Sequence, residues 1–438
     1  MPGYLNAITP DSLSGVLFAL EGVGGAVTLL NGPTGCKFYH SAISDAQLSR
    51  GRDLDPLSYP EELFFGQPRV PCTYLDNDDY VYGSADKLES AIKTLAERAP
   101  FELLAIVNSP GAALIGDDVA GIAARALPGR PITTVETPGF SAGICAGHET
   151  AALALVGACA AWPSPPRRPE TGPPPTGPRV NLLGMSIHER NHTGDVAELR
   201  RLFGLVGVET GVVLCGGSTW HETRRLGDAA LNVVVHAEFG GATAQALHER
   251  FGTPFHLCDG PPIGFAATEA MLREVCAALG ADPGPAIADS EQARARSYAF
   301  VSRVDSVSGL PQGVPFAVEG ACSKAYAYVR HLARYFGLVP VAVTVQNPEA
   351  DAFRPRLEAL LADLGVSAAL DADVGASGAD IVFASGNTIA RLKAEGGHFC
   401  GVEIALPTLG YLDVTPKTHL GVAGALQLTE AVLNALPF

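Results

Sequence analysis

Short apolar runs alternate along the chain with longer segments in which apolar residues recur every three or four positions. The runs GGAVTLL (24–30), RVNLLGM (179–185) and GVVLCGG (211–217) consist mostly of apolar residues and glycine. Strands that are apolar on both faces are typical of parallel sheets covered by helices on both sides. The pattern therefore predicts an α/β fold with mainly parallel sheets.

The segment HTGDVAELRRLFGLVGVE (192–209) predicts a helix, which Thr193 or Asp195 is expected to cap. The residues on its apolar face are Val196, Leu199, Leu202 and Phe203. The same order of strand, helix and strand returns from PFAVEG (315–320) to VAVTVQ (341–346). ADIVFASG, TIARLKAEGG and GVEIALP then continue the alternation.

A proline-rich stretch, PSPPRRPETGPPPTGP (163–178), divides the chain. Such a stretch forms neither a helix nor a sheet ladder, so it is expected to be an extended linker. The sequence around it predicts three α/β units, at residues 1–162, 179–312 and 313–438. Ligands of parallel sheets bind beyond the carboxyl ends of the strands, where this chain has glycine-rich loops such as NGPTGC and NSPGAALIGDD.

Composition and charge narrow the class of protein. The 438 residues include 47% apolar and 17% charged residues, and the formal charge of −16 argues against binding to nucleic acid. The N-terminus lacks the basic and apolar parts of a signal peptide, and the apolar runs suggest no span of membrane length. A cytoplasmic chain without membrane contact is therefore expected. The nine cysteines are scattered and odd in number, which disfavours a disulfide framework.

The turn LNGPTGCKFYHS (30–41) is similar to a phosphate loop but departs from it at three positions. Asn31 and Cys36 stand where glycines are required, and Phe38 replaces the hydroxyl residue. No Walker A motif, dinucleotide fingerprint or Cys-x-x-Cys pair occurs anywhere in the chain. The chain is therefore not expected to hydrolyse ATP or to bind NAD in the usual manner.

A cysteine on a glycine-rich turn after a strand is a candidate metal ligand. Gly32 and Gly35 would let inorganic sulfur approach the backbone near Cys36, whose neighbouring amides can stabilise negative charge. The alternative for Cys36, and equally for Cys72 beside Pro71, is a buried structural thiol. Asp11 is most simply the cap of a helix that begins at SLSGVLFALEG.

The order GPTGC, NDDYVYGSADKLESAI, LIGDDVAGI, VETPGFSAGICAGHETA and THLGVAGALQLTEAVLNAL resembles the nitrogenase component 1 family, with final segments closest to β-type subunits. The resemblance implies three Rossmann-like domains and an iron–sulfur cluster between two subunits. It also implies a separate ATP-hydrolysing iron protein as electron donor, which would explain the missing phosphate loop. The family's cluster cysteine falls on Cys36.

The chain also departs from the family pattern of three cluster cysteines in a nitrogenase β subunit. The first of these falls on or near Asp11, and the segment expected to hold the third, NSPGAA (108–113), has no thiol. An aspartate at the first position resembles the reductase branch, in which a carboxylate can complete a four-iron cubane. No role follows for Cys72. His236 lies near the cofactor cysteine of α-type subunits, although a hydrogen-bonded core histidine is the simpler interpretation.

A cubane needs four protein ligands, so the resemblance implies a [4Fe-4S] cluster shared with a partner. An α-type subunit with three cysteines, in a heterotetramer, is preferred over a homodimer that uses two copies of Cys36 with Cys72 or Asp11. A larger cluster held by the partner is an open alternative. No catalytic residue is identified.

The expected function is that of an oxidoreductase subunit that passes electrons to a tetrapyrrole or to a small organic molecule such as a methylthio-alkane. Two alternatives stay open. One is a scaffold subunit for the assembly of nitrogenase-type metalloclusters, and the other is a metal-free structural partner of an α-type subunit.

Overall fold

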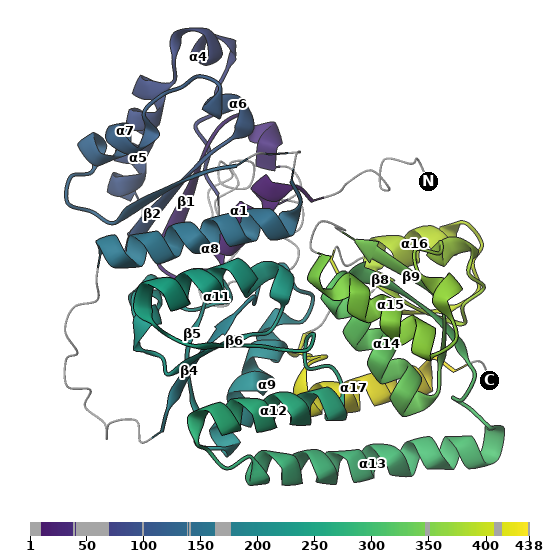
Figure 1. Ribbon diagram of the computed structural model, residues 1–438. Helices are drawn as coiled ribbons and strands as arrows, with labels where there is room; N and C mark the ends of the chain where they lie inside the picture. The colour runs from purple at the N-terminus through teal and green to yellow at the C-terminus, as the bar shows by residue number, and fades with distance from the viewer. Residues whose placement is uncertain are drawn as a thin grey trace.

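Three separate sheets, each built only from parallel strands among the described residues, form the frame of the molecule (Figure 1). The predicted α/β class with parallel sheets is confirmed. The structure is a computed structural model. The residues that it describes are 10–37, 40, 70–98, 100–137, 139, 142–162, 177–346, 351–406 and 414–436.

The first sheet has the strand order β1-β2-β3 and is covered on both faces. Helices α1 and α8 pack on one face, and α5 and α7 pack on the other. Its strands are β1 (Ala26–Asn31), β2 (Leu103–Asn108) and β3 (Ile132–Glu136). Its helices are α1 (Ser12–Glu21), η2 (Thr34–Lys37), α4 (Asn77–Tyr82), α5 (Ala85–Arg98), α6 (Pro110–Ala113), α7 (Val119–Ala126) and α8 (Ile144–Ala161).

The second sheet has the order β5-β4-β6-β7. Its strands are β4 (Arg179–Leu183), β5 (Glu209–Val213), β6 (Leu231–Val234) and β7 (Phe255–Leu257). The helices that follow these strands are α9 (His192–Leu205), α10 (Trp220–Thr223), η5 (Leu226–Asp228), α11 (Ala237–Phe251), α12 (Phe265–Leu279) and α13 (Gly284–Ser308). The apolar runs at 179–185 and 211–217 thus contain strands, as predicted.

The third sheet has the order β11-β10-β8-β9. Its strands are β8 (Pro315–Ala321), β9 (Val339–Gln346), β10 (Ile381–Ser385) and β11 (Cys400–Ala405). The helices of this part are α14 (Cys322–Phe336), η6 (Asp351–Phe353), α15 (Arg354–Asp363), η7 (Ser367–Ala369), η8 (Val374–Ala376), α16 (Gly386–Ala394) and α17 (Gly421–Asn434).

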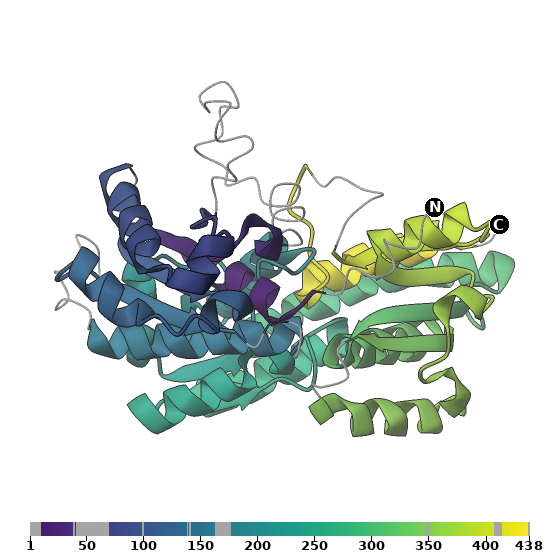
Figure 2. The ribbon, with the colours of Figure 1, turned by 90° about the horizontal axis from the view of Figure 1, so that it is seen from above.

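Each sheet lies within one predicted unit, but the units share their cores. Helix α8 of the first unit contacts both α1 and α11, and α11 belongs to the second sheet. The last helix, α17, packs against α9, α12 and α13 of the second unit. One apolar cluster accordingly runs from the second sheet into the third. Seen from above, the first and third units lie on opposite sides of the molecule (Figure 2). The predicted linker lies outside the described residues at 163–176.

Helix α8 corrects the expectation that the chain contains no apolar span of membrane length. Its 18 residues are long and apolar enough to cross a membrane by length and composition. The helix packs between α1 and α11, however, and 56% of it is buried inside the protein. The helix is apolar because α1 and α11 cover two of its sides, as expected for a helix in the core of a protein.

Helix α9 forms where the sequence predicts it, but neither predicted residue caps it. Asn191 occupies the cap position, and Asp195 is buried in the first turn. The Asp195 carboxylate accepts hydrogen bonds from the Thr418 hydroxyl (2.6 Å) and from the backbone N–H of His419 (3.1 Å). The partner segment is more than 200 residues away, and burial raises the pKa of Asp195 to about 6.

Titratable side chains that are buried or nearly buried gather where the three units meet. They are His148 on α8, His188 and Glu189 in the turn before α9, His236 at the start of α11, and Lys324 on α14. Burial lowers the pKa of both His148 and His188 to about 4. For Glu189, burial by itself would raise the pKa, but Lys324 and His236 outweigh it and hold the pKa at about 2.

The sequence contains a His-Glu-x-x-His pattern at this junction, at residues 188–192. In zinc proteases this pattern lies on a helix, so that both imidazoles share one face. Here residues 187–191 form a turn, and Glu189 pairs with Lys324. The pattern therefore contributes to the junction between units and does not form the helical zinc motif.

The crossing of α1 and α8 depends on two glycines. A Cβ at Gly147 would lie 1.8 Å from the carbonyl oxygen of Ser12, and one at Gly15 would lie 2.0 Å from that of Ile144. We expect Gly147→Ala to lower the free energy of unfolding by about 1–3 kcal/mol, because the helices must separate. Gly157→Ala on the same helix meets nothing within 4 Å and should instead stabilise by roughly 0.5–1 kcal/mol. Urea unfolding measures the change in stability of both variants. Equal changes in Gly147→Ala and Gly157→Ala would contradict the close crossing.

The junction histidines predict a loss of stability in acid. An unfolded histidine has a pKa of about 6.5, whereas His148 in the folded chain has a pKa of about 4. Between these values only the unfolded chain takes up the proton, so the free energy of unfolding falls as the pH drops. For His148 we expect a loss on the order of 2 kcal/mol between about pH 7.5 and about pH 5. Urea unfolding at several pH values measures this loss. In His148→Gln the free energy of unfolding should fall less between about pH 7.5 and about pH 5 than in the unsubstituted protein, whereas in the exposed control His221→Gln it should fall by the same amount.

Candidate metal centre

The carboxyl edge of the first sheet brings together the three predicted ligands. Cys36 lies on η2, directly after β1, and Asp11 precedes α1. Cys72 lies on an extended segment that pairs in parallel with Leu30 of β1. Burial raises the pKa of the half-buried Cys36 thiol, and the charges of Asp11 and of Cys72 raise it further. Asp11 and Cys72 are therefore each close enough to Cys36 to act on its thiol electrostatically.

The segment with Cys72 is fixed to the turn with Cys36 from two sides. The backbone N–H of Leu30 donates to Pro71 (2.9 Å), and the N–H of Thr73 donates to Leu30 (3.0 Å). The ammonium group of the buried Lys37 donates to the carbonyl of Val70. Cys72 thus lies in an irregular segment that forms a single β-bridge to the edge strand of the sheet, and its thiol is buried.

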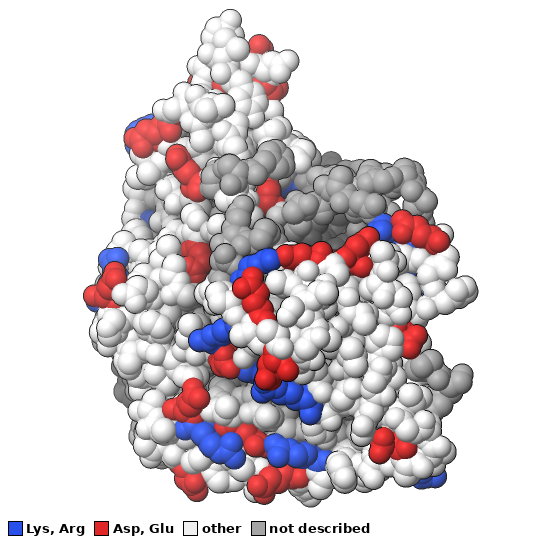
Figure 3. Space-filling view, turned by 45° about the vertical axis from the view of Figure 1, so that its right-hand side comes forward, with Lys and Arg blue, Asp and Glu red and all other residues white. Residues whose placement is uncertain are grey.

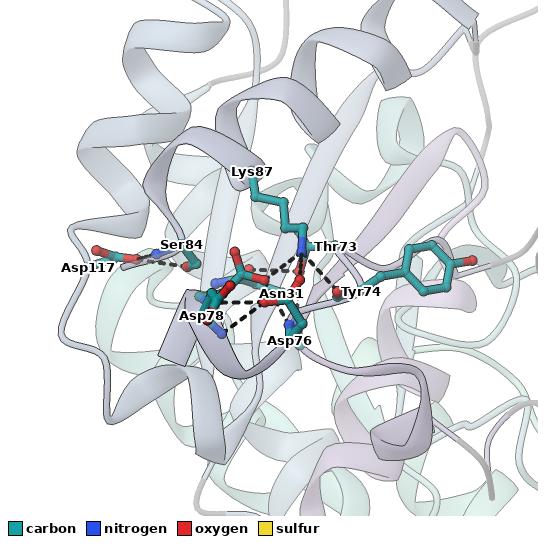
Figure 4. A network of polar contacts seen from close by, with 10 residues as sticks. Asn31, Thr73, Tyr74, Asp76, Asp78, Ser84, Lys87 and Asp117 are labelled. Atoms are coloured by element: carbon teal, nitrogen blue, oxygen red, sulfur yellow. Dashed lines mark hydrogen bonds and ion pairs between the residues drawn. The ribbon is translucent and has the colours of Figure 1, made fainter. Parts of the chain in front are cut away.

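Buried amides at the strand ends set the shape of this edge (Figure 4). Asn31 ends β1 and Asn108 ends β2 at the same register position, and their side chains are joined at 3.0 Å. The Thr73 hydroxyl donates to Asn31 (3.0 Å) and accepts from the N–H of Gly32 (3.0 Å). The three polar residues lie in different sequence segments. The sequence analysis did not single out these residues. Of the three, only Asn31 and Asn108 could have been noticed from the sequence, because each ends an apolar strand.

Two glycines were predicted to give a cofactor access to the turn, and the structure distinguishes them. A Cβ at Gly32 would lie 2.5 Å from the Ser109 hydroxyl, so this glycine is required by packing against the start of α6. A Cβ at Gly35 meets nothing within 4 Å. The side of the turn at Gly35 is open, and a role of either glycine in cofactor binding stays a prediction.

Asp11 caps α1, as its position in the sequence suggested. Its Oδ1 accepts from the backbone N–H and from the hydroxyl of Ser14, both at 2.9 Å. The backbone of Asp11 also pairs with Gly143 at the start of α8. Because both side-chain bonds use Oδ1, the second carboxylate oxygen is not needed for the cap. A ligand role for that oxygen is compatible with the cap.

An exposed apolar patch lies beside the candidate ligands. Its residues are Tyr74, Tyr80, Val81, Tyr82 and Leu114, of which Val81, Tyr82 and Leu114 are more than 70% exposed. Tyr74 is hydrogen-bonded to Cys72, and Tyr80 lies close enough to Cys36 for its charge to raise the pKa of the phenol. Tyr74 and Tyr80 of this patch therefore lie beside the two candidate thiols.

A network of charged side chains holds this patch in place (Figure 4). Asp76 and Asp79 form a reciprocal cap at the start of α4. Lys87 of α5 donates to Asp76 (3.0 Å), to Asp79 (2.5 Å) and to the carbonyl of Tyr74 (3.1 Å). The short helix α4 buries none of its residues, so these bonds and not a core fix its exposed apolar side chains.

The donor types at this edge fit an iron–sulfur cluster, whose irons are held mainly by thiolates. The raised pKa of Cys36 keeps its thiol protonated, so binding to iron would release that proton. Within the described part of the chain, no group of three or more histidine, cysteine or acidic side chains is arranged to hold a metal ion by itself. A cluster at this edge would therefore need further ligands.

Similarity to known proteins agrees with these features. A light-independent protochlorophyllide reductase subunit from Bradyrhizobium sp. is 33% identical over 228 residues, 51% of this chain and 43% of that protein. The corresponding protein from Methylobacterium radiotolerans is 30% identical over 315 residues, 70% of this chain and 57% of that protein. The chain thus matches less than two thirds of the length of these curated relatives.

The fold is also that of a solved nitrogenase protein. The structure of nitrogenase Cp1 at pH 6.5 superposes with a TM-score of 0.77 and 18% identity, over 98% of this chain and 93% of that chain. A family model described as nitrogenase component 1 type oxidoreductase matches residues 12–437. The predicted family is therefore confirmed, and the chain belongs to the nitrogenase component 1 type oxidoreductases.

Proposed function

We propose that the chain is the β-type subunit of a nitrogenase-like reductase. It holds an iron–sulfur cluster at an interface with an α-type subunit and passes electrons from an ATP-dependent iron protein to a substrate. The observation that carries the proposal is the convergence of Cys36, Asp11 and Cys72 at one edge of the first sheet. Membership of an oxidoreductase family supports it.

The ligand number favours a shared [4Fe-4S] site. A cubane takes four protein ligands, and this edge offers at most Cys36, Cys72 and the second oxygen of Asp11. An α-type partner with three cysteines needs only one ligand from this chain, either Cys36 or Asp11. A second copy of this chain could instead supply Cys36 with Cys72 or Asp11. When bound, the cluster supplies one-electron redox chemistry, while this chain orients the ligands and excludes water by burial.

The relatives favour a tetrapyrrole as the class of substrate. They are named as subunits of protochlorophyllide reductase, and this chain shares up to about a third of its aligned residues with them. Because the alignments span only part of those proteins, a small organic substrate such as a methylthio-alkane is the alternative. In that case a larger metallocluster would be held mainly by the partner.

A scaffold for metallocluster assembly is the second candidate. It is favoured by the single cysteine of the turn and by the absence of a thiol from residues 108–113. A turnover assay with the purified complex, an iron protein, ATP and a reductant separates the two functions. A reductase turns over substrate only with the iron protein and ATP, whereas a scaffold transfers its cluster without turnover. A metal-free structural partner would bind no iron at all.

The location that we propose is the cytoplasm, without contact to a membrane. All nine cysteines are free thiols, as is usual in a reducing compartment. On the face seen in Figure 3, acidic and basic side chains are interspersed, with no broad basic area among the residues described there. This surface and the formal charge of −16 support a protein partner and no nucleic acid.

Cys36→Ala should remove iron from the complex and weaken the association of the subunits together, because the shared cluster bridges the chains. Anaerobic iron counting, electron paramagnetic resonance and sedimentation measure these effects. The exposed Cys400 provides the control, since Cys400→Ala should retain both iron and assembly. Full iron content with an unchanged spectrum in Cys36→Ala would refute the metal site.

The two roles of Asp11 can be separated by two substitutions. Asp11→Ala should cost about 1 kcal/mol of stability, because the cap of α1 is lost. Asp11→Ser keeps a capping oxygen and should retain that stability. If the carboxylate is a cluster ligand, both variants lose iron or shift the spectrum. If both keep the iron and only Asp11→Ala loses stability, Asp11 is a cap alone.

The exposed patch next to Cys36 is the surface that we propose for docking of the iron protein. Val81→Asp combined with Tyr82→Ala should leave the iron content unchanged, because neither side chain is buried. The concentration of iron protein needed for half-maximal turnover should rise by tenfold or more. Val307→Asp, on an equally exposed residue of the distant helix α13, is the matched control. An unchanged concentration dependence in the double variant would place the docking surface elsewhere.

A further inference from the structure

Ser109 lies between the ends of the first two strands, next to the turn that carries Cys36. It directly follows β2, and its backbone N–H donates to the carbonyl of Asn31, the last residue of β1 (3.0 Å). Its side chain is fully buried. The hydroxyl oxygen is only 2.5 Å from the place that a Cβ on Gly32 would occupy. The hydroxyl is therefore enclosed by this edge of the sheet and needs hydrogen-bond partners there.

Three groups of the described chain are partners of the Ser109 hydroxyl. The backbone N–H of Ala112 donates to it (3.3 Å). The side chains of Cys36 and Tyr80 are both hydrogen-bonded to it. A Cβ on Gly111 would lie 3.1 Å from the phenol oxygen of Tyr80, so the phenol lies against α6, the helix that Ser109 caps. The turn with Cys36, the helix α4 with Tyr80 and the start of α6 thus meet at one hydroxyl.

The donors and acceptors of these groups fix the direction of the bonds when Cys36 is a thiolate. A hydroxyl has one proton to donate and two lone pairs that accept. A thiolate can only accept and a backbone N–H can only donate, so the Ser109 proton is directed at the sulfur and one lone pair serves Ala112. The second lone pair is left for Tyr80, whose hydroxyl then donates. Burial, and after it the charge of Cys36, raises the pKa of the Tyr80 phenol, so the phenol retains the proton for this bond.

We propose that Ser109 is a positioning residue of the metal centre, which donates a hydrogen bond to the sulfur of Cys36 and is itself oriented by the hydroxyl of Tyr80. A hydrogen bond to a negatively charged acceptor is stronger than one between neutral groups. At a ligand sulfur it offsets part of the negative charge and favours the reduced state of an iron–sulfur site. The bond from Ser109 therefore raises the reduction potential of a cluster held by Cys36.

The inference rests on the proposed function in one respect, the binding of iron by Cys36, whereas the hydrogen bond itself does not depend on iron. Residues 108–113 lack the third thiol of the family pattern, and through Ser109 this segment acts on the site without being a ligand. Tyr80 belongs to the exposed patch and is 37% exposed. The bonds from Tyr80 to Ser109 and from Ser109 to Cys36 therefore connect the surface with the candidate ligand.

A redox titration of the purified complex, followed by electron paramagnetic resonance, measures the effect at the cluster. Ser109→Ala removes the donor to the sulfur, and Tyr80→Phe removes only a hydroxyl from a partly exposed ring. Both variants should keep their iron, and the midpoint potential should become more negative, with the larger shift in Ser109→Ala. Tyr298→Phe, on an exposed tyrosine of the distant helix α13, is the control and should leave the potential unchanged. Unchanged potentials in both Ser109→Ala and Tyr80→Phe would overturn the inference.

Alkylation of the full chain without iron tests the hydrogen bond separately from the cluster. The thiolate is the form that reacts with iodoacetamide, so loss of the bond should slow the reaction of Cys36 at about pH 8 by about threefold or more in Ser109→Ala. The midpoint of its rate against pH should rise in both variants, whereas a change of packing alone would alter the rate by the same factor at every pH.

Peptide mass spectrometry separates Cys36 from the exposed Cys400, whose rate is the internal reference. An unchanged midpoint for Cys36 in Ser109→Ala would overturn the inference, whether or not the complex binds iron. A raised midpoint in a chain whose complex binds no iron would support the hydrogen bond and refute only the proposed function.

Discussion

The close crossing of α1 and α8 is the contact on which the site and its connection to the rest of the molecule depend. At Gly15 and Gly147 a backbone carbonyl of each helix occupies the space of a side chain on the other. The crossing brings the start of α1, with Asp11, next to Gly143 at the start of α8. Since α8 also packs on α11, any change in the crossing would be transmitted from the candidate ligands to the second unit.

Electrostatics at the candidate centre differ from those at the junction of the three units. Cys36 is half-buried beside a carboxylate and a second thiol, and these neighbours favour its neutral form. The site thus disfavours a thiolate at Cys36, and a cation bound there would reverse that preference. At the junction, Glu189 and Lys324 already compensate each other, and burial keeps the nearby histidines neutral at physiological pH.

The shared cores indicate how the three units can behave. The apolar cluster that runs from the second sheet into the third, together with α17 packed on α9, α12 and α13, makes these two units one cooperative body. The exposed patch on α4 has the opposite character, because a few hydrogen bonds to Lys87 hold it and no core supports it. A surface of this kind suits a reversible protein contact, whereas the joint between the second and third units suits a permanent one.

Much of the fold was readable from the sequence because its signals are local. Apolar runs such as those at 24–30 and 179–185 indicate strands that are buried on both faces. The apolar face of α9 indicates a helix that is buried along one side. Asp11 was recognised as a cap because a cap acts on residues only three positions away. The family resemblance rested on motifs of a few residues each, and these made Cys36 a candidate ligand, which stays a prediction.

What only the tertiary structure decided are the partners of residues that are distant in the chain. Asp195 was predicted to cap its own helix, yet it binds a segment more than 200 residues away. Nothing in the sequence around Cys72 indicates its neighbour, which is Leu30 of the first sheet, joined to it by an isolated β-bridge. Helix α8 is apolar on all sides because two different units cover it. The local periodicity of apolar residues does not encode such pairings. It indicates whether a side chain is buried, but the group that buries it is determined by the packing of the whole chain.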